Sequence, residues 1–201
     1  MNGGSGASGP RSMLAVRIGA NAALVAAALV MTYEGYRARV YNDPIGRLAV
    51  CYGHDDKKLK KGQQFTKAEC EALLDVDLLL HADVLNCVTE PAIEKLTDGQ
   101  KAALVSFAFN VGVDRACAST FVQRINAGEG QAACAELSRW VYAGGKVLPG
   151  LVARRKAERS VCEEIPDAET TPQHSTASPV ALPPEGAPAA LGRPGGDGVT
   201  S

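Results

Sequence analysis

The sequence lacks an excess of charge of either sign. Its 201 residues contain 21 Lys and Arg against 22 Asp and Glu, a formal net charge of −1. Residues 34–164 are balanced as well, with 18 basic and 18 acidic side chains. Because binding to nucleic acid depends on a surplus of positive charge, we expect no nucleic-acid partner. A chain of this length forms one domain with a real core and leaves room for tails.

Metal-ligand patterns are scarce too. The chain has three His, and its six Cys lie far apart without a C-x-x-C motif or a Cys/His cluster. We therefore expect no metal site. An even number of Cys, all between residues 51 and 162, indicates disulfides and an oxidising compartment. Six Cys allow fifteen connectivities, and the spacing alone selects none of them.

Residues 13–33 lack an uninterrupted apolar run of the length that crosses a membrane, which is ~18 residues or more. The 16 residues from Ile18 to Tyr33 carry no charge and follow Arg11 and Arg17. That is the charge order of an export signal, although Gly, Asn and many Ala dilute the run. We interpret residues 13–33 as a signal or signal-anchor segment. An Ala-rich first helix of the folded domain is the alternative.

Both ends of the chain lack the residues that build a core. Residues 1–12 are rich in Gly and Ser without periodicity, which indicates a flexible N-terminus. Residues 165–201 hold seven of the eleven Pro and no Cys, Trp, Tyr or Phe. Such a segment cannot bury enough apolar surface to fold. We expect a disordered tail rich in Pro, Ala and Gly at residues 165–201, and a folded catalytic domain over residues 34–164.

Helix signals are frequent between the tails. Two capping boxes, Thr66-Lys67-Ala68-Glu69 and Thr97-Asp98-Gly99-Gln100, each precede a run with helical apolar periodicity. The first run extends to Leu85, and the second covers residues 101–111 and ends at Gly112. Shorter helices are expected at about residues 119–126, 131–142 and 150–162.

Residues 40–52 show a different pattern. β-Branched and aromatic residues flank the turn signal Asp43-Pro44-Ile45-Gly46, which predicts a small hairpin. With helices over most of the remaining chain, the predicted fold class is α+β, mainly helical, with one small sheet near the N-terminus.

Two carboxylates lie on separate predicted elements. Glu34 stands where the apolar stretch ends, and Asp43 follows nine residues later at the hairpin turn. Glycoside hydrolysis needs such a pair: an acid that protonates the leaving oxygen, and a carboxylate that activates water or attacks the sugar. Apolar neighbours would keep Glu34 protonated, whereas Asp43 in a turn would stay ionised. The spacing alone is weak evidence, because two solvated surface groups are the commoner reason for it.

Short segments around and after the carboxylates form a characteristic series. They are Glu34-Gly35, Tyr41-Asn42-Asp43, Gly46 and Val50-Cys51-Tyr52-Gly53-His54, followed by residues 104–112, 119–128 and 139–155. Together they resemble the catalytic signature and the later helices of the phage-type lysozymes, glycoside hydrolase family 24. The resemblance covers about residues 33–162 and looks strongest toward the endolysins of lambdoid phages, many of which carry an N-terminal signal-anchor.

That resemblance implies a lysozyme-like two-lobed fold, with a small β-hairpin lobe and a helical lobe. It implies Glu34 as general acid and Asp43 as the carboxylate that handles the water, in an enzyme that cleaves peptidoglycan between N-acetylmuramic acid and N-acetylglucosamine and so lyses the host cell. It implies no metal and no organic cofactor. It further implies a monomer exported to the host periplasm, with membrane contact only through residues 13–33.

One departure from the family signature falls on the predicted active site. Ala49 stands where the family has a threonine thought to help hold the water. We interpret this as a weakened or differently tuned enzyme. A non-catalytic peptidoglycan-binding protein with the same fold is the alternative, and activity on chitin-like polymers or lytic transglycosylation also remains open.

The resemblance also implies pairings elsewhere in the chain. It favours Cys87 with Cys117, with Cys51–Cys70 and Cys134–Cys162 as the remaining bridges, and it matches His54 with Asp77 as a structural ion pair. We interpret Trp140 as a core residue rather than a platform for sugars. Arg154 and Arg155 either pair with Glu34 or substrate, or lie on a solvated helix face.

Overall fold

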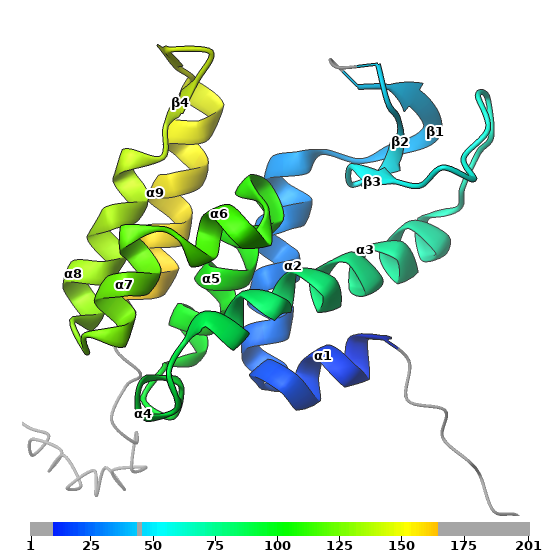
Figure 1. The fold of residues 1–201 in the computed structure, drawn as a ribbon. Coiled ribbons are helices and arrows are strands. Elements are labelled where there is room, and N and C mark those ends of the chain that lie inside the picture. Colours follow the sequence, from blue (N-terminus) through cyan, green and yellow to red (C-terminus); the bar gives the residue numbers. More distant parts are fainter. Residues whose placement is uncertain (1–9, 44–45, 165–201) are drawn as a thin grey trace, which may run out of the picture. The chain divides into compact units, whose positions relative to one another are not determined.

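The computed structural model describes residues 10–43 and 46–164 (Figure 1). The predicted tail at residues 165–201, most of the predicted flexible N-terminus, and Pro44 and Ile45 of the hairpin turn lie outside these residues. Residues 10–12, which were expected to be flexible, begin the first helix.

Two N-terminal helices pack onto the helical body. α1 (Pro10–Ile18) and α2 (Ala20–Glu34) meet at Gly19, whose φ of 95° suits glycine. The side chain of Ile18 is buried, and Arg17 forms an ion pair of 2.8 Å with Asp83 of a later segment. α2 packs against the central helix (Figure 1). In this structure residues 13–33 therefore lie in the folded body, as the Ala-rich helix alternative describes. Among the described residues, no helix is long and apolar enough to cross a membrane.

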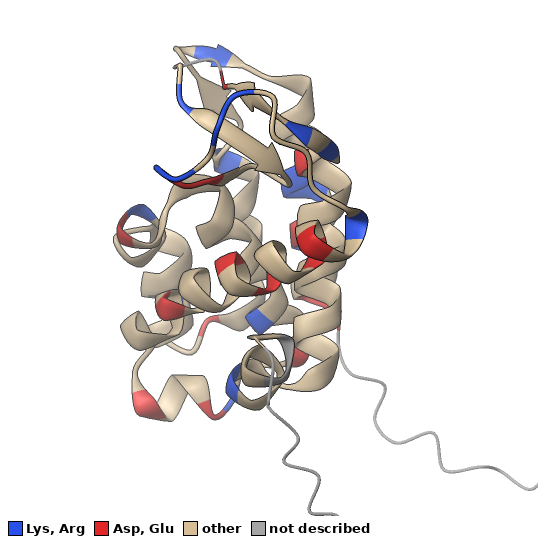
Figure 2. Cartoon of the chain, turned by 90° about the vertical axis from the view of Figure 1, so that its right-hand side faces the viewer, with Lys and Arg blue, Asp and Glu red and all other residues tan. Residues whose placement is uncertain are grey.

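A small sheet follows α2 directly. β1 (Arg37–Asn42), β2 (Leu48–Cys51) and β3 (His54–Asp55) form an antiparallel sheet in the order β1-β2-β3. Tyr41 lies opposite Ala49, and Val50 lies opposite His54. The predicted hairpin is confirmed, with a third short strand added. In Figure 2, Lys and Arg lie along the strands and loops of this sheet with a few acidic residues among them, and most Asp and Glu lie on the helices.

The rest of the described chain is mainly helical. Its elements are α3 (Lys67–His81), η1 (Ala82–Cys87), α4 (Glu90–Ile93), α5 (Asp98–Val111), α6 (Val113–Cys117), α7 (Thr120–Asn126), α8 (Gly130–Glu136), η2 (Leu137–Arg139), β4 (Tyr142–Ala143), β5 (Lys146–Val147) and α9 (Pro149–Glu163). Both predicted capping boxes are confirmed, because the hydroxyls of Thr66 and Thr97 accept from the amides of Glu69 and Gln100. α5 is the core helix, buried from residue 102 to residue 108. The fold class is α+β and mainly helical, as predicted.

Two predicted helices are wrong at their C-terminal ends. The helix expected to extend to Leu85 stops at His81, and the 3-10 helix η1 follows. The helix expected to reach residue 142 stops at Glu136, a 3-10 turn follows, and Tyr142 lies in a second hairpin opposite Val147. Gly144 and Gly145 both have positive φ, 56° and 74°, which is the backbone that a tight two-residue hairpin turn requires. The expectation of a single sheet was therefore wrong: the described residues contain two small sheets.

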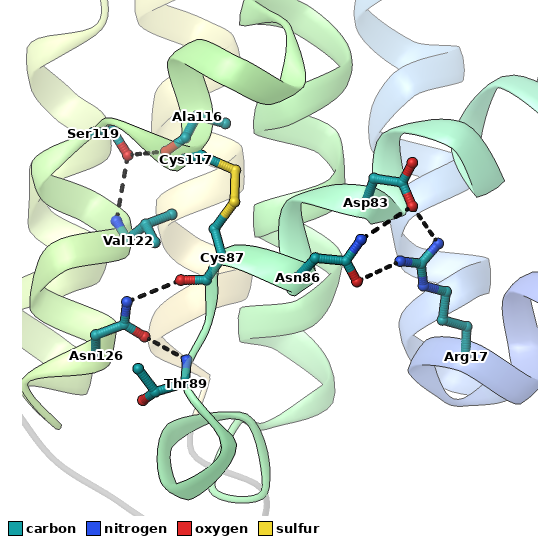
Figure 3. Close-up of a disulfide and its surroundings, with 10 residues drawn as sticks. All are labelled: Arg17, Asp83, Asn86, Cys87, Thr89, Ala116, Cys117, Ser119, Val122 and Asn126. Atoms are coloured by element: carbon teal, nitrogen blue, oxygen red, sulfur yellow. Dashed lines mark hydrogen bonds and ion pairs between the residues drawn. A yellow bond between two sulfur atoms is a disulfide. The ribbon is translucent and has the colours of Figure 1, made fainter.

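Three disulfides connect the elements. They are Cys51–Cys70, Cys87–Cys117 and Cys134–Cys162, and all three pairings implied by the resemblance are confirmed. Figure 3 shows the second of them, beside which Asn126 donates to the carbonyl of Cys87 and accepts from the amide of Thr89. Each bridge is expected to stabilise the fold by about 2–4 kcal/mol. The first ties the small sheet to α3, and the third ties α8 to α9.

Candidate active site

Glu34 is the last residue of α2, where the chain leaves the helical body for the small sheet. Gly35 follows with a φ of 73°, which lets the backbone turn sharply into β1. The Glu34 side chain is 24% exposed. It lines an open pocket of ≈ 310 Å³ together with Tyr33, Asn110, Leu148, Gly150, Leu151 and Arg154. A carboxyl group thus reaches a pocket large enough for part of a sugar.

The setting of Glu34 differs from the predicted apolar one. Nη1 of Arg154 donates to Oε1 of Glu34 at 2.5 Å, and Arg154 itself is only 3% exposed. The expectation of a purely apolar setting was wrong because the apolar residues before Glu34, such as Val30, turn toward the core, while the last turn of α2 reaches α9. Arg154 pairs with Glu34, so the alternative of a solvated helix face is wrong for this arginine.

The other oxygen of Glu34 lies toward the small sheet. A Cβ placed on Gly53, in the turn between β2 and β3, would lie 3.7 Å from Oε2. Gly53 has a φ of 88°, so glycine suits the turn for conformational reasons as well. Because Arg154 occupies Oε1, Oε2 is the oxygen that faces the sheet side of the site.

Behind Arg154 lies a buried ionic cluster. Nε of Arg154 lies 3.0 Å from Oε1 of Glu158, and Nε of Arg155 lies 3.0 Å from Oε2 of Glu158. Ser106 of α5 donates its hydroxyl to Oε1 of Glu158 at 2.7 Å. Burial raises the pKa of Glu158, which the two guanidinium groups oppose, and burial lowers the pKa of Arg155 to about 10.

Ser106 and Glu158 were not predicted from the sequence. One signal was available: Arg154, Arg155 and Glu158 have helical i, i+3 and i+4 spacing, which places the three charges on one face of α9. Spacing does not reveal that this face is buried against α5.

Asp43 lies in the turn after β1. Its carboxylate Oδ1 accepts from the amide of Arg47 at 2.7 Å, and its own amide donates to the carbonyl of Arg47 at 2.8 Å. The side chain is half-buried. The structure thus places the two candidate carboxylates at opposite ends of β1, with Glu34 at the helical body and Asp43 on the small sheet.

Ala49 lies in β2, opposite Tyr41 on β1 and Asp55 on β3. It is 4% exposed, so protein atoms cover nearly all of its surface. A larger side chain at this position would need room among these neighbours.

His54 and Asp77 join the small sheet to α3. Nδ1 of His54 lies 3.0 Å from each carboxylate oxygen of Asp77, which confirms the expected pair. The hydrogen bond to Asp77 raises the pKa of His54, while burial acts in the opposite direction. Together with Cys51–Cys70, this pair ties the small sheet to α3.

Trp140 packs against Phe107 and Arg115. Its ring lies edge-on to Phe107 at 5.0 Å, and the guanidinium of Arg115 lies 5.6 Å from the ring centroid. These contacts agree with a packing role. Within residues 10–43 and 46–164, no group of three or more His, Cys, Asp or Glu is arranged to hold a metal ion.

Comparison with known proteins places these residues in a family. Residues 31–158 match the family model Phage lysozyme. The chain is 45% identical over 129 residues to a SAR-endolysin of Bacteriophage PS119, covering 64% of this chain and 75% of that protein. It is 38% identical over 159 residues to a SAR-endolysin of Enterobacteria phage P21, covering 76% of this chain and 94% of that protein.

Solved structures show the same similarity. The muramidase domain of SpmX from Asticaccaulis excentricus has a TM-score of 0.63 at 32% identity, covering 70% of this chain and 95% of that one. An endolysin from Escherichia coli O157:H7 phage FAHEc1 has a TM-score of 0.62 at 25% identity, covering 70% of this chain and 91% of that one.

Proposed function

The chain belongs to the phage lysozyme family, and on that premise we propose that it is an endolysin, a glycosidase that hydrolyses peptidoglycan between N-acetylmuramic acid and N-acetylglucosamine. The observation that carries the proposal is the carboxyl group of Glu34, held by Arg154 at the wall of an open pocket. The non-catalytic alternative is not favoured, because relatives at 38–45% identity are named endolysins.

We assign the chemistry to two residues of the catalytic domain, residues 34–164. Glu34 protonates the leaving glycosidic oxygen, and Asp43 handles the attacking water. Oε1 of Glu34 is taken by Arg154, so Oε2, beside Gly53, carries the proton that is delivered. The backbone of the turn supports the Asp43 carboxylate through the amide of Arg47. Peptidoglycan is the one partner this assignment requires.

Product analysis tests the reaction type. Hydrolysis of purified peptidoglycan adds water and leaves a reducing N-acetylmuramic acid at each cut. Lytic transglycosylation forms an internal anhydro ring and leaves no reducing end there. We expect reducing muropeptides and no cleavage of chitin oligosaccharides. Anhydro products, or faster cleavage of chitin, would overturn the proposed reaction.

We further propose that residues 13–33 direct export to the host periplasm and are the only part of a monomeric protein to contact the membrane. The support is the charge-free run from Ile18 to Tyr33 after Arg11 and Arg17, together with similarity to the SAR-endolysins of phages PS119 and P21. A fusion of residues 1–33 to a reporter that is active only in the periplasm checks this. A silent fusion would favour residues 13–33 as a helix pair of the folded body alone.

Replacing Ala49 by Thr is expected to increase turnover. A threonine hydroxyl can hydrogen-bond the water next to Asp43, and an alanine methyl cannot. One such bond is worth ~0.5–1.5 kcal/mol, so Ala49→Thr should raise the rate of peptidoglycan hydrolysis by up to about tenfold.

The matched control for this change is Ala49→Val, which has the shape of threonine without the hydroxyl. Because Ala49 is 4% exposed, both variants add the same bulk, and thermal melting reports whether that bulk fits. We expect no gain from Ala49→Val. Equal rates for the two variants would show that the hydroxyl does not act on the water.

A further inference from the structure

Glu158 is a charged residue that the assigned chemistry does not use. Its side chain is completely buried on α9, between Arg154 and Arg155. Ionised groups are costly to bury, and apolar residues of similar size usually serve stability as well or better. The position of Glu158 behind a guanidinium that contacts Glu34 points to a role in the active site.

The contacts of Arg154 fix the orientation of its guanidinium group. Nε donates to Oε1 of Glu158 at 3.0 Å, and Nη2 donates to the carbonyl of Ser106 at 3.1 Å. The guanidinium is planar with a fixed fork, so these two bonds determine where Nη1 points. Nη1 meets Oε1 of Glu34.

Glu158 is held in turn from α5. Ser106 donates its hydroxyl to Oε1 of Glu158 at 2.7 Å, so the same residue contacts both Glu158 and Arg154. Arg155 supports Glu158 from the other side and donates to Asn110 at 2.9 Å. Asn110 lines the same pocket as Glu34.

An ionised Glu158 offsets one of the two positive charges carried by Arg154 and Arg155. Without the charge of Glu158, two buried guanidinium groups would act on the carboxyl group of Glu34 alone, because Arg155 is also close enough to feel the Glu34 charge. More positive charge favours the ionised form of a carboxyl group, and an ionised Glu34 cannot donate a proton.

We propose that Glu158 is a positioning residue of the active site, which with Ser106 aims Arg154 at Glu34 and offsets enough positive charge for Glu34 to carry its proton. This inference rests on the proposed role of Glu34 as general acid. The Glu158 side chain is completely buried, so it acts on Glu34 through Arg154.

Each element packed around Glu34 contributes to its electrostatic setting. α9 contributes Arg154 and Arg155, which are cationic, and α5 contributes the neutral Asn110. α2 itself contributes Tyr33, whose hydroxyl donates to the carbonyl of Ala153, and the turn between β2 and β3 contributes Gly53. Among these groups Arg154 and Arg155 carry the charge that acts on Glu34, and Glu158 contacts both.

The test is the pH profile of peptidoglycan hydrolysis by Glu158→Gln protein. Glutamine keeps the shape and one acceptor oxygen but loses the charge. We expect the alkaline limb to move to lower pH by roughly one unit, a tenfold loss of activity on that side, with much of the activity recovered at acidic pH. A ¹³C NMR titration of the Glu34 carboxyl should move in the same direction, which gives a readout independent of turnover.

Two further variants make the test specific. Ser106→Ala keeps the Glu158 charge and removes one hydrogen bond, so we expect a smaller shift in the same direction. Glu163→Gln removes a charge from the same helix, but Glu163 pairs with Arg159 at the surface, and we expect no shift. If Glu158→Gln does not fold, Ser106→Ala decides, and an unmoved alkaline limb in that variant overturns the proposal.

The outcomes separate this inference from the proposed function. A Glu158→Gln profile that is lowered equally at every pH, with an unmoved Glu34 titration, would show a merely structural role and leave Glu34 as the acid. Retained activity in Glu34→Gln protein would refute the proposed function itself.

Discussion

Glu34→Gln protein is expected to lose lytic activity by about 10²–10⁴-fold, the usual contribution of a general acid. The amide has the shape of the carboxyl group, and its oxygen can still accept from Nη1 of Arg154, which now meets Oε1 of Glu34. It has no acidic proton to give to the leaving oxygen. The decrease in turbidity of chloroform-treated Gram-negative cells, measured with purified protein, gives the comparison with the parent.

The control for this loss is Glu94→Gln, which removes an exposed glutamate at the end of α4. We expect parental activity from it. Circular dichroism and melting temperature should show that Glu34→Gln protein is folded, because Arg154 keeps its contacts with Ser106 and Glu158 as partners for its charge. Lysis by a folded Glu34→Gln protein at a parental rate would remove Glu34 from the role of acid.

Local signals predicted the elements whose hydrogen bonds are made within a few residues. The boxes at Thr66 and Thr97 begin α3 and α5 because hydroxyl and backbone amide lie three residues apart. The turn after Asp43 likewise predicted the first hairpin. The second hairpin was missed because Gly144-Gly145 ends a helix as readily as it turns a hairpin.

Hydropathy could not decide whether residues 13–33 are an export signal or a helix of the folded domain. An Ala-rich, charge-free run suits an export signal, and it equally suits a helix such as α2 that packs closely against α5. The buried face of α2 carries four alanines, Ala22, Ala23, Ala26 and Ala27. Their small side chains allow close helix packing, which a hydropathy profile does not record.

The candidate site could be predicted only in part. Family resemblance singled out Glu34 and Asp43, and it left the partner of Glu34 open. The Glu34–Arg154 contact joins residues 120 positions apart, and Ser106–Glu158 joins residues 52 apart. Such contacts depend on how α2, α5 and α9 pack together, which periodicity along one helix cannot specify.

The largest loss of stability is expected from a substitution at Gly99. Gly99 lies in the first turn of α5, where the end of α9 passes so closely that a Cβ on Gly99 would overlap the backbone carbonyl of Val161. A backbone group cannot rotate away as a side chain can. The Cys134–Cys162 disulfide fixes the neighbouring residue of α9, so α9 cannot slide without straining that bridge. Gly99→Ala should therefore destabilise the protein by ~1–3 kcal/mol.

The sign of the effect makes this prediction specific. Alanine in place of glycine at an unstrained helical position normally stabilises a protein by about 0.4–1 kcal/mol. Gly150 provides that case, because it lies in the first turn of α9 and a Cβ there would meet nothing within 4 Å. We expect Gly150→Ala to melt at or above the parental temperature and Gly99→Ala several degrees below it, with all disulfides oxidised. If both variants melted at the same temperature, α5 and α9 would be farther apart at Gly99 than the structure places them. The close packing of these two helices, which buries Glu158, would then lose its support.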